Sequence, residues 1–214
     1  MDAQTRMENA MLLYRPIGLE ELLLVLASGM KAFPPRLPEQ PIFYPVTNEG
    51  YAAQIARDWN TKSDSLAGYV TRFSVSDSYA STLPVKTVGA REHQELWVPA
   101  EKLEDFNKEI EGQITVIDAF FGEGFRGSLP KAFALKDKDA VAQLVALNEI
   151  HRDSLMDFHR EIAANQDAVF VHFPLWKRRS FVVEGVTDAE RRTLLNAIRK
   201  AWSEVSSTMP LSDI

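Results

Sequence analysis

The sequence predicts an α+β fold, because strand-like and helix-like runs alternate without the regular order of a parallel sheet. Residues 68–75 alternate between apolar and polar side chains, as a half-buried strand does. Residues 19–26 place leucines at the i, i+3, i+4 and i+7 positions of an amphipathic helix. Several strand-like runs are joined by short loops rather than by helices, which argues against a doubly wound parallel sheet.

The first half of the chain contains most of the predicted strands. Asn48 is placed to cap a helix that runs to Trp59, and a short helix near residues 103–110 is expected to end at Gly112. The four prolines in residues 31–41 predict an extended connection. Strand-like runs cover residues 12–14, 42–44, 84–88, 95–98 and 114–121.

The glycine-rich run at residues 122–127 predicts a boundary between a first domain, 1–122, and a C-terminal α/β extension, 123–214. In the extension we expect helices around 141–147 and 155–162 and strands at 168–173 and 181–184. Thr187 and Glu190 form a capping-box pattern ahead of a last amphipathic helix. Because the linker is short, we expect the extension to pack on the first domain.

Composition excludes several classes of protein. The chain has 214 residues, no cysteine and a net charge of -6, so disulfides and thiolate chemistry are excluded and general nucleic-acid binding is not expected. No apolar run approaches the roughly 20 residues that span a bilayer, and no signal peptide is visible. We therefore expect no membrane partner and a cytoplasmic protein, although a secreted effector without a cleaved signal would look the same.

The basic run at residues 176–179 is expected to form a loop between two strands.

Three short motifs each place a chemically useful residue beside a predicted strand: LYRP at 13–16, FYPVTNEGYAAQIA at 43–56 and HQELWVP at 93–99. Together they resemble the three-part signature of ADP-ribosyltransferases. That resemblance implies a split antiparallel β-sheet core with flanking helices and NAD as the substrate. ADP-ribosyl transfer passes through an oxocarbenium-like state, as glycoside cleavage does, so its site needs a carboxylate, a group that fixes the dinucleotide and an aromatic face.

The resemblance assigns the first two motifs to NAD binding. In the family, an arginine or histidine on the first strand holds a ribose or the phosphates, which makes Arg15 the candidate. The second motif is a strand that ends in an aromatic pair, followed by a helix with alanines four residues apart, here Ala52 and Ala56. Tyr44 would then stack on the nicotinamide. Tyr51 is a further aromatic candidate, and the alternative is that both tyrosines are ordinary core residues.

The third motif resembles the family's catalytic strand, on which a glutamate precedes a proline by four residues. Glu95 would hydrogen-bond the ribose and stabilise developing positive charge. His93 lies two residues earlier, where the family usually has a glutamine or glutamate, so it would share the face of Glu95. Glu92 is the alternative carboxylate if the register is displaced.

Residues 13–122 also resemble small bacterial proteins that are labelled "ADP-ribosylation/crystallin J1", in the runs LYRPIGL, AFPPR, PIFYPV and QELWVPAE. The hydrolases in that label use aspartates around two magnesium ions in an all-helical fold, and the sequence indicates neither. His151 and His159 lie eight residues apart, too far to share one metal on a helix. No metal site is therefore expected.

Two functions remain open at this level. The first is an NAD-dependent ADP-ribosyltransferase, a glycosyltransferase that modifies an unidentified protein or nucleic-acid acceptor and acts in the manner of a toxin or effector. The alternative is a catalytically inactive binding module on the same fold, indicated by His93 in the auxiliary position. A third hypothesis, transfer to RNA phosphate, is disfavoured by the acidic charge balance.

Overall fold

A computed structural model of the chain describes residues 10–178 and 180–212. Contacts within the chain divide it into two compact units, Met1–Gly122 and Glu123–Ile214, called unit 1 and unit 2 below. Unit 1 combines helices with small antiparallel sheets, which confirms the predicted α+β class.

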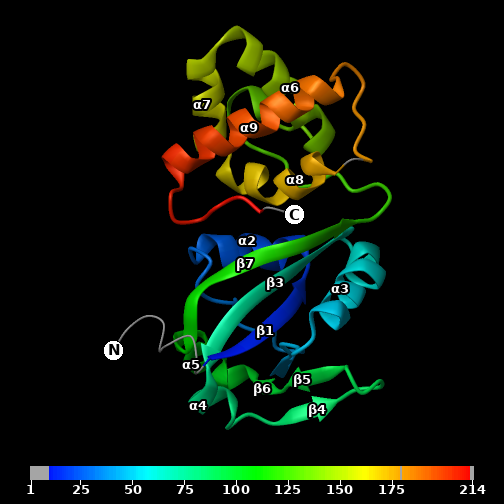
Figure 1. The fold of residues 1–214 in the computed structure, drawn as a ribbon, viewed down its shortest axis with the longest axis vertical. Helices are drawn as coiled ribbons and strands as arrows, with labels where there is room; N and C mark the ends of the chain where they lie inside the picture. Colours follow the sequence, from blue (N-terminus) through cyan, green and yellow to red (C-terminus); the bar gives the residue numbers. More distant parts are fainter. Residues whose placement is uncertain (1–9, 179, 213–214) are drawn as a thin grey trace. The chain divides into compact units, whose positions relative to one another are not determined.

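The main sheet of unit 1 has three long antiparallel strands in the order β1-β3-β7 (Figure 1). They are β1 (Ala10–Ile17), β3 (Ala67–Ser76) and β7 (Ile110–Phe121). Two smaller antiparallel pairs join β2 (Ile42–Phe43) to β6 (Val98–Pro99), and β4 (Val85–Thr87) to β5 (Gln94–Leu96).

Four α-helices of unit 1 are α2 (Leu19–Ala27), α3 (Glu49–Asp58), α4 (Asp77–Ala80) and α5 (Leu103–Lys108). Short 3-10 turns occupy Asn60–Lys62 and Ala100–Lys102. Asn48 caps α3 as predicted, because its side chain accepts a hydrogen bond from the Tyr51 N–H at 2.9 Å. Gly112 does not end a helix; it lies inside β7 with φ +78°.

The two faces of the main sheet have different coverings. On one face, the rings of Phe33, Phe43 and Phe73 pack together, with Phe33 4.9 Å from Phe73 and 5.0 Å from Phe43. On the other face, α3 places Ala52 and Ala56 against Val70 of β3. Residues 67–71 of β3 are all buried, as a strand covered on both sides must be.

Neighbouring residues of β1 point to these two faces in turn, because strand side chains alternate. Tyr14 packs with the α3 cluster. Arg15 points the other way, toward α2 and the phenylalanine rings. Beside β1, Val46 exchanges two backbone hydrogen bonds of 2.8 Å with Tyr14 and lies opposite Glu95 on its other side. Val46 thus joins the main sheet to the β4–β5 pair.

The regular secondary structure in the described part of unit 2 is helical, apart from an isolated bridge. It contains α6 (Ala140–Asp153), α7 (Leu155–Ala164), α8 (Gln166–Lys177) and α9 (Asp188–Val205), with a 3-10 turn at Phe133–Leu135. The capping box predicted for the last helix is present, with Thr187 and Glu190 bonded reciprocally.

The prediction of an α/β extension is therefore wrong for unit 2. Residues 168–173, predicted as a strand, lie inside α8, and residues 181–184 form no strand beyond an isolated bridge between Val183 and Val186. The run AVFVHF is apolar except for His172, as suits a helix that is buried on almost every side. Periodicity cannot separate such a helix from a buried strand.

The basic run at 176–179 is also not a loop between strands. Trp176 is fully buried in α8, Lys177 is the last residue of that helix, and Arg178 is its C-cap. Arg179 lies outside the described residues. Among the helices that the structure describes, none has both the length and the apolar character needed to cross a membrane.

Candidate functional site

Glu95 lies in β5, and two neighbouring side chains hold its carboxylate. The Tyr51 hydroxyl donates a hydrogen bond to Glu95 Oε1 at 3.1 Å, and Trp97 Nε1 donates to Oε2 at 3.2 Å. Trp97 reaches this carboxylate because residues two apart along a strand share a face. Tyr51 reaches it from the first turn of α3. Burial, and then the Glu95 charge, raise the pKa of Tyr51, so it remains a hydrogen-bond donor.

Aromatic rings gather around this carboxylate. The His93 ring stacks on Tyr51 with 4.0 Å between centroids and an interplanar angle of 11°. The Tyr44 ring meets Trp97 edge to face at 5.3 Å and 77°. We call these five residues, Tyr44, Tyr51, His93, Glu95 and Trp97, the Glu95 cluster.

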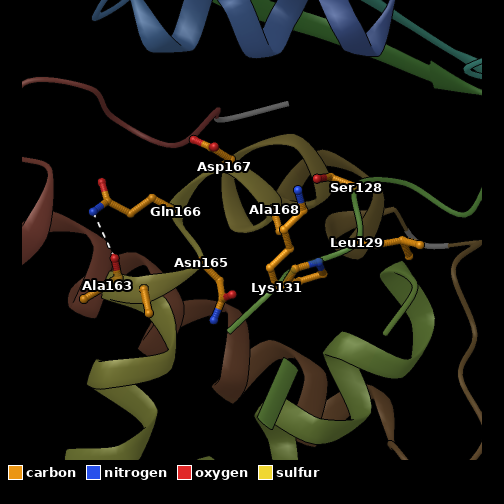
Figure 2. A pocket seen from close by; sticks show the side chains of 10 residues that line it. Ser128, Leu129, Lys131, Ala163, Asn165, Gln166, Asp167 and Ala168 are labelled. Atoms are coloured by element: carbon orange, nitrogen blue, oxygen red, sulfur yellow. Dashed lines mark hydrogen bonds between the residues drawn. The ribbon is translucent and has the colours of Figure 1, made fainter. Parts of the chain in front are cut away.

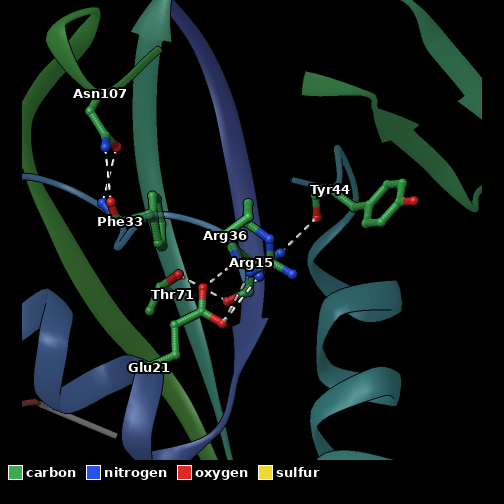
Figure 3. Close-up of polar contacts among 7 residues, drawn as sticks. All are labelled: Arg15, Glu21, Phe33, Arg36, Tyr44, Thr71 and Asn107. Carbon is green, nitrogen blue, oxygen red and sulfur yellow. Dashed lines mark hydrogen bonds and ion pairs between the residues drawn. The ribbon is translucent and has the colours of Figure 1, made fainter. Parts of the chain in front are cut away.

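Arg15 belongs to a second polar group, which is largely buried. Its Nε and NH2 donate to the two carboxylate oxygens of Glu21 at 2.7 and 3.1 Å, and its NH1 donates to the Tyr44 carbonyl oxygen at 3.3 Å (Figure 3). Its guanidinium also lies 4.4 Å from the centroid of the Phe43 ring. Glu21 and Tyr44 therefore fix the orientation of Arg15, of which only 7% is exposed.

Arg36 completes this second group, and its role was missed by sequence reasoning. Its NH1 lies 3.9 Å from Glu21 Oε2, an ion-pair distance too long for a hydrogen bond. Its buried Nε has no hydrogen-bond partner among the described residues. We call Arg15, Glu21 and Arg36 the arginine cluster. Arg36 comes from the proline-rich segment, which was interpreted as a connection and, in the run AFPPR, as part of a family resemblance, but the arginine was given no role.

Tyr44 connects the two clusters through opposite ends of the residue. Its carbonyl oxygen faces Arg15, whereas its ring points away from the guanidinium groups in Figure 3 and packs on Trp97. Because Arg15 and Tyr14 point to opposite faces of β1 and Tyr51 packs on the Tyr14 side, the two clusters lie toward different faces of that strand. The structure links Arg15, Tyr44 and Glu95, but it does not set them side by side.

The remaining expected residues take no part in either cluster. Glu92 is exposed and precedes β5, and no described contact joins it to Glu95. His159 pairs with Glu204 at 3.0 Å, and the His151 ring packs against Phe158. Within residues 10–178 and 180–212, no three histidine or carboxylate side chains are grouped in a way that could hold a metal ion.

Unit 2 has polar groups of its own in the core. His172 Nε2 accepts a hydrogen bond from the Ser128 N–H at 2.9 Å, so its Nδ1 donates to Gln143 Oε1 at 3.0 Å. Burial lowers the pKa of His172 to about 3, so the ring is neutral. Gly127 makes room for it, because a Cβ there would overlap His172 Nε2. This histidine is a structural residue of unit 2.

The hollows on the described part of unit 2 include two of similar size. One, of about 530 Å³, is lined by residues 128–131 and 163–168 at the start of α8 (Figure 2). In it, the Gln166 amide donates to the Ala163 carbonyl at 3.1 Å, and Lys131 and Asp167 supply charges of opposite sign. The other, of about 470 Å³, is basic and includes Lys177 and Arg192. None of the three motifs lies in either hollow, although Lys177 of the basic run at 176–179 lines the second.

Comparison with known proteins adds no assignment. No family model matches the chain, and it has no match among curated proteins or among solved structures.

Proposed function

We propose that the chain transfers ADP-ribose from NAD to a macromolecular acceptor, with Glu95 as the catalytic carboxylate. In this reaction the bond between the nicotinamide nitrogen and the ribose carbon breaks, and its electron pair leaves with nicotinamide. A nucleophile of the acceptor then bonds to that carbon and loses its proton to the solvent. The ribose passes through an oxocarbenium-like state, which a nearby carboxylate stabilises.

The observation that carries this proposal is that the partly exposed carboxylate of Glu95 is held in one position and surrounded by aromatic rings. Tyr51 and Trp97 hold both oxygens of Glu95, so the charge has a defined position. Electron-rich rings beside an anion attract a cationic ring such as the nicotinamide of NAD. In this proposal Tyr44, Tyr51 and Trp97 form the surface for that ring.

His93 has a supporting part in the same proposal. Its ring lies flat on Tyr51, whose hydroxyl holds Glu95. It therefore acts by positioning Tyr51. In this proposal His93 does not take a proton from the acceptor's nucleophile. In this proposal the arginine cluster holds the phosphate end of the dinucleotide, because Tyr44 contacts Arg15 through its carbonyl oxygen and Trp97 through its ring.

A second candidate, a binding module without catalysis, is favoured by the same contacts. Both oxygens of Glu95 already accept hydrogen bonds, and Lys86 places its ammonium 3.5 Å from the centroid of the Trp97 ring. A lysine from a partner would fit this combination of ring and carboxylate as a nicotinamide would. The two candidates differ in whether NAD is consumed.

The test is NAD consumption by the purified full-length protein and by Glu95→Gln. Glutamine keeps the size of the side chain but removes the negative charge, so we expect nicotinamide release to fall about 100-fold, the effect of losing one key electrostatic group. Tyr51→Phe should lower the rate less, because it removes one of two donors to Glu95.

The matched control is Glu104→Gln, which makes the same chemical change elsewhere in unit 1. The Glu104 side chain is 86% exposed. It should leave nicotinamide release unchanged. Equal rates for the wild-type protein and Glu95→Gln would contradict the assignment of Glu95. Absence of any NAD consumption, together with binding of a lysine-containing peptide that Glu95→Gln abolishes, would establish the binding module instead.

A further inference from the structure

The charges of the arginine cluster do not balance. Arg15 and Arg36 contribute two positive charges, and the carboxylate that they share, Glu21, contributes one negative charge. Both arginine side chains are largely withdrawn from water, with 8% and 11% of their surface exposed. A buried charge without a partner is costly, so this arrangement favours a further anion.

The two arginines are not equivalent in this cluster. Arg15 donates hydrogen bonds from Nε and NH2 to Glu21 and from NH1 to the Tyr44 carbonyl oxygen. Arg36 meets Glu21 only at 3.9 Å, and its Nε lacks a partner among the described residues. A guanidinium carries five N–H donors in a planar fork that matches a phosphate or carboxylate. The donors left for a ligand therefore belong to Arg36.

The charge state of Arg36 agrees with this geometry. Burial, and then the positive charge of Arg15, lower the pKa of Arg36, while Glu21 opposes the shift. An arginine stays protonated in proteins nonetheless. An anion on Arg36 would remove the repulsion from Arg15 and replace the hydration that burial has taken away.

The segment that carries Arg36 is partly exposed. Residues 34–36 have no regular structure, and the neighbouring residues Pro35 and Leu37 are exposed, Leu37 by 56%. The Arg36 backbone is thus free of sheet and helix hydrogen bonds. Because Nε itself is buried, a ligand that bonds to it requires this segment to move.

We propose that Arg36, oriented beside Arg15 by the Glu21 carboxylate that both face, is the binding residue for a phosphate group on unit 1. Arg15 is then a positioning residue, which holds Glu21 and the Tyr44 carbonyl in place. The phosphate is that of a dinucleotide such as NAD, an identification that rests on the proposed function. The phosphate site itself rests on the arginine cluster alone.

The test measures anion binding to the full-length protein by calorimetry and by the shift of Tm, with inorganic pyrophosphate and ADP-ribose as probes and sodium chloride at matched ionic strength as the reference. We expect wild-type protein to bind both probes beyond the effect of chloride. Arg36→Met, which keeps the apolar stem but removes the fork, should bind each about tenfold more weakly, the order expected for one charge-assisted contact.

Two further variants keep the test decisive. Arg36→Lys retains the charge and most of the packing but lacks the planar fork, so it should fold as the wild type does and bind pyrophosphate more weakly than wild type. Arg192→Gln is the matched control, because Arg192 lies in the basic hollow of unit 2 and its loss changes the net charge by the same amount. It should bind both probes as wild-type protein does.

Three results would overturn the proposal: pyrophosphate acting no differently from chloride, unchanged binding in both Arg36 variants, or loss of binding in Arg192→Gln. Binding of pyrophosphate that depends on Arg36, without binding of ADP-ribose and without NAD consumption, would support the phosphate site and contradict the proposed function. Binding of ADP-ribose that depends on Arg36 would support both.

Discussion

Arg36 in unit 1 and Arg191 in unit 2 are buried to nearly the same degree, with 11% and 10% of their side chains exposed, but their surroundings differ. Arg191 donates to the carbonyl oxygens of Trp176 and Arg178 and pairs with Asp188 at 3.0 Å. Arg36 has a distant carboxylate and an unpartnered Nε among the described residues. A buried arginine with all its partners from its own chain serves the fold, whereas one that lacks them has donors available for a ligand.

The same contrast extends to the neutral polar groups of unit 2. His172 uses both ring nitrogens, one toward Ser128 and one toward Gln143. Gln143 in turn donates to the carbonyl oxygens of Ser128 and Lys138 at 3.0 and 2.6 Å. These bonds fasten the segment that enters unit 2 to the buried helix α8. Unit 2 thus satisfies its core polar groups internally.

The largest effect that the comparison predicts is for Arg191→Met. This change leaves the carbonyl oxygens of Trp176 and Arg178 without the donor that ends α8, so we expect the free energy of unfolding to fall by about 3 kcal/mol. Urea unfolding measures it. Glu184→Gln, a surface change in the same unit, is the control and should stay within about 0.5 kcal/mol of wild type. If Arg191→Met lowered the free energy of unfolding by less than about 1 kcal/mol, Arg191 would not differ from Arg36 in its importance for folding.

The next effect is a pH dependence caused by His172. Its pKa is about 3 in the folded protein and about 6.5 when unfolded, so the unfolded chain takes up the proton first as pH falls. The contribution of neutral His172 to the free energy of unfolding is complete above pH 6.5 and is lost progressively as the pH falls toward 3. Between pH 7.5 and pH 5 this group alone lowers the free energy of unfolding by about 2 kcal/mol.

His172→Gln isolates that contribution, because glutamine does not titrate. The variant is expected to be less stable at pH 7.5, but its free energy of unfolding should depend less on pH than that of the wild type over this range. Parallel pH profiles for the two proteins would show that a group other than His172 causes the loss.

The smallest effect is expected for Arg36→Met in the absence of any anion. The change removes a donor without a partner and the repulsion from Arg15, so the free energy of unfolding should change by less than about 1 kcal/mol, and an increase is the favoured direction. Thermal unfolding in a buffer free of phosphate and sulfate measures it. A large loss would mean that Arg36 is a structural residue like Arg191.

Local signals in the sequence predicted much of unit 1 and less of unit 2. The Asn48 cap and the leucine spacing of α2 depend on a few neighbouring residues, and both match the structure. Alternation along residues 68–75 correctly predicted the strand β3, but residues 67–71 are buried on both faces rather than half-buried. Helix α8 was predicted as a strand because burial on all sides erases its period, and Pro174 within it adds a second contrary signal.

The candidate site could be predicted only where its residues follow a motif. Glu95, Tyr44, Tyr51, His93 and Arg15 were named from sequence patterns, and each has contacts in one of the two clusters. Arg36 and Trp97 lie in the quoted runs AFPPR and HQELWVP but were given no role. The i, i+2 spacing could have placed Trp97 beside Glu95, whereas Arg36 meets Glu21 only because the proline-rich segment folds back onto α2. Such contacts between distant segments leave no local spacing to read.

Trp97 gives the Glu95 cluster an optical signal of its own. Its indole N–H is bonded to a carboxylate, an ammonium lies over its face and a tyrosine ring meets its edge. Of the four tryptophans, Trp176 and Trp202 are buried in unit 2 and Trp59 is 69% exposed. A ligand that displaces Lys86 or takes up the Glu95 oxygens changes the electric field on Trp97, so we expect occupancy of this cluster to change the wavelength and intensity of tryptophan emission without a label.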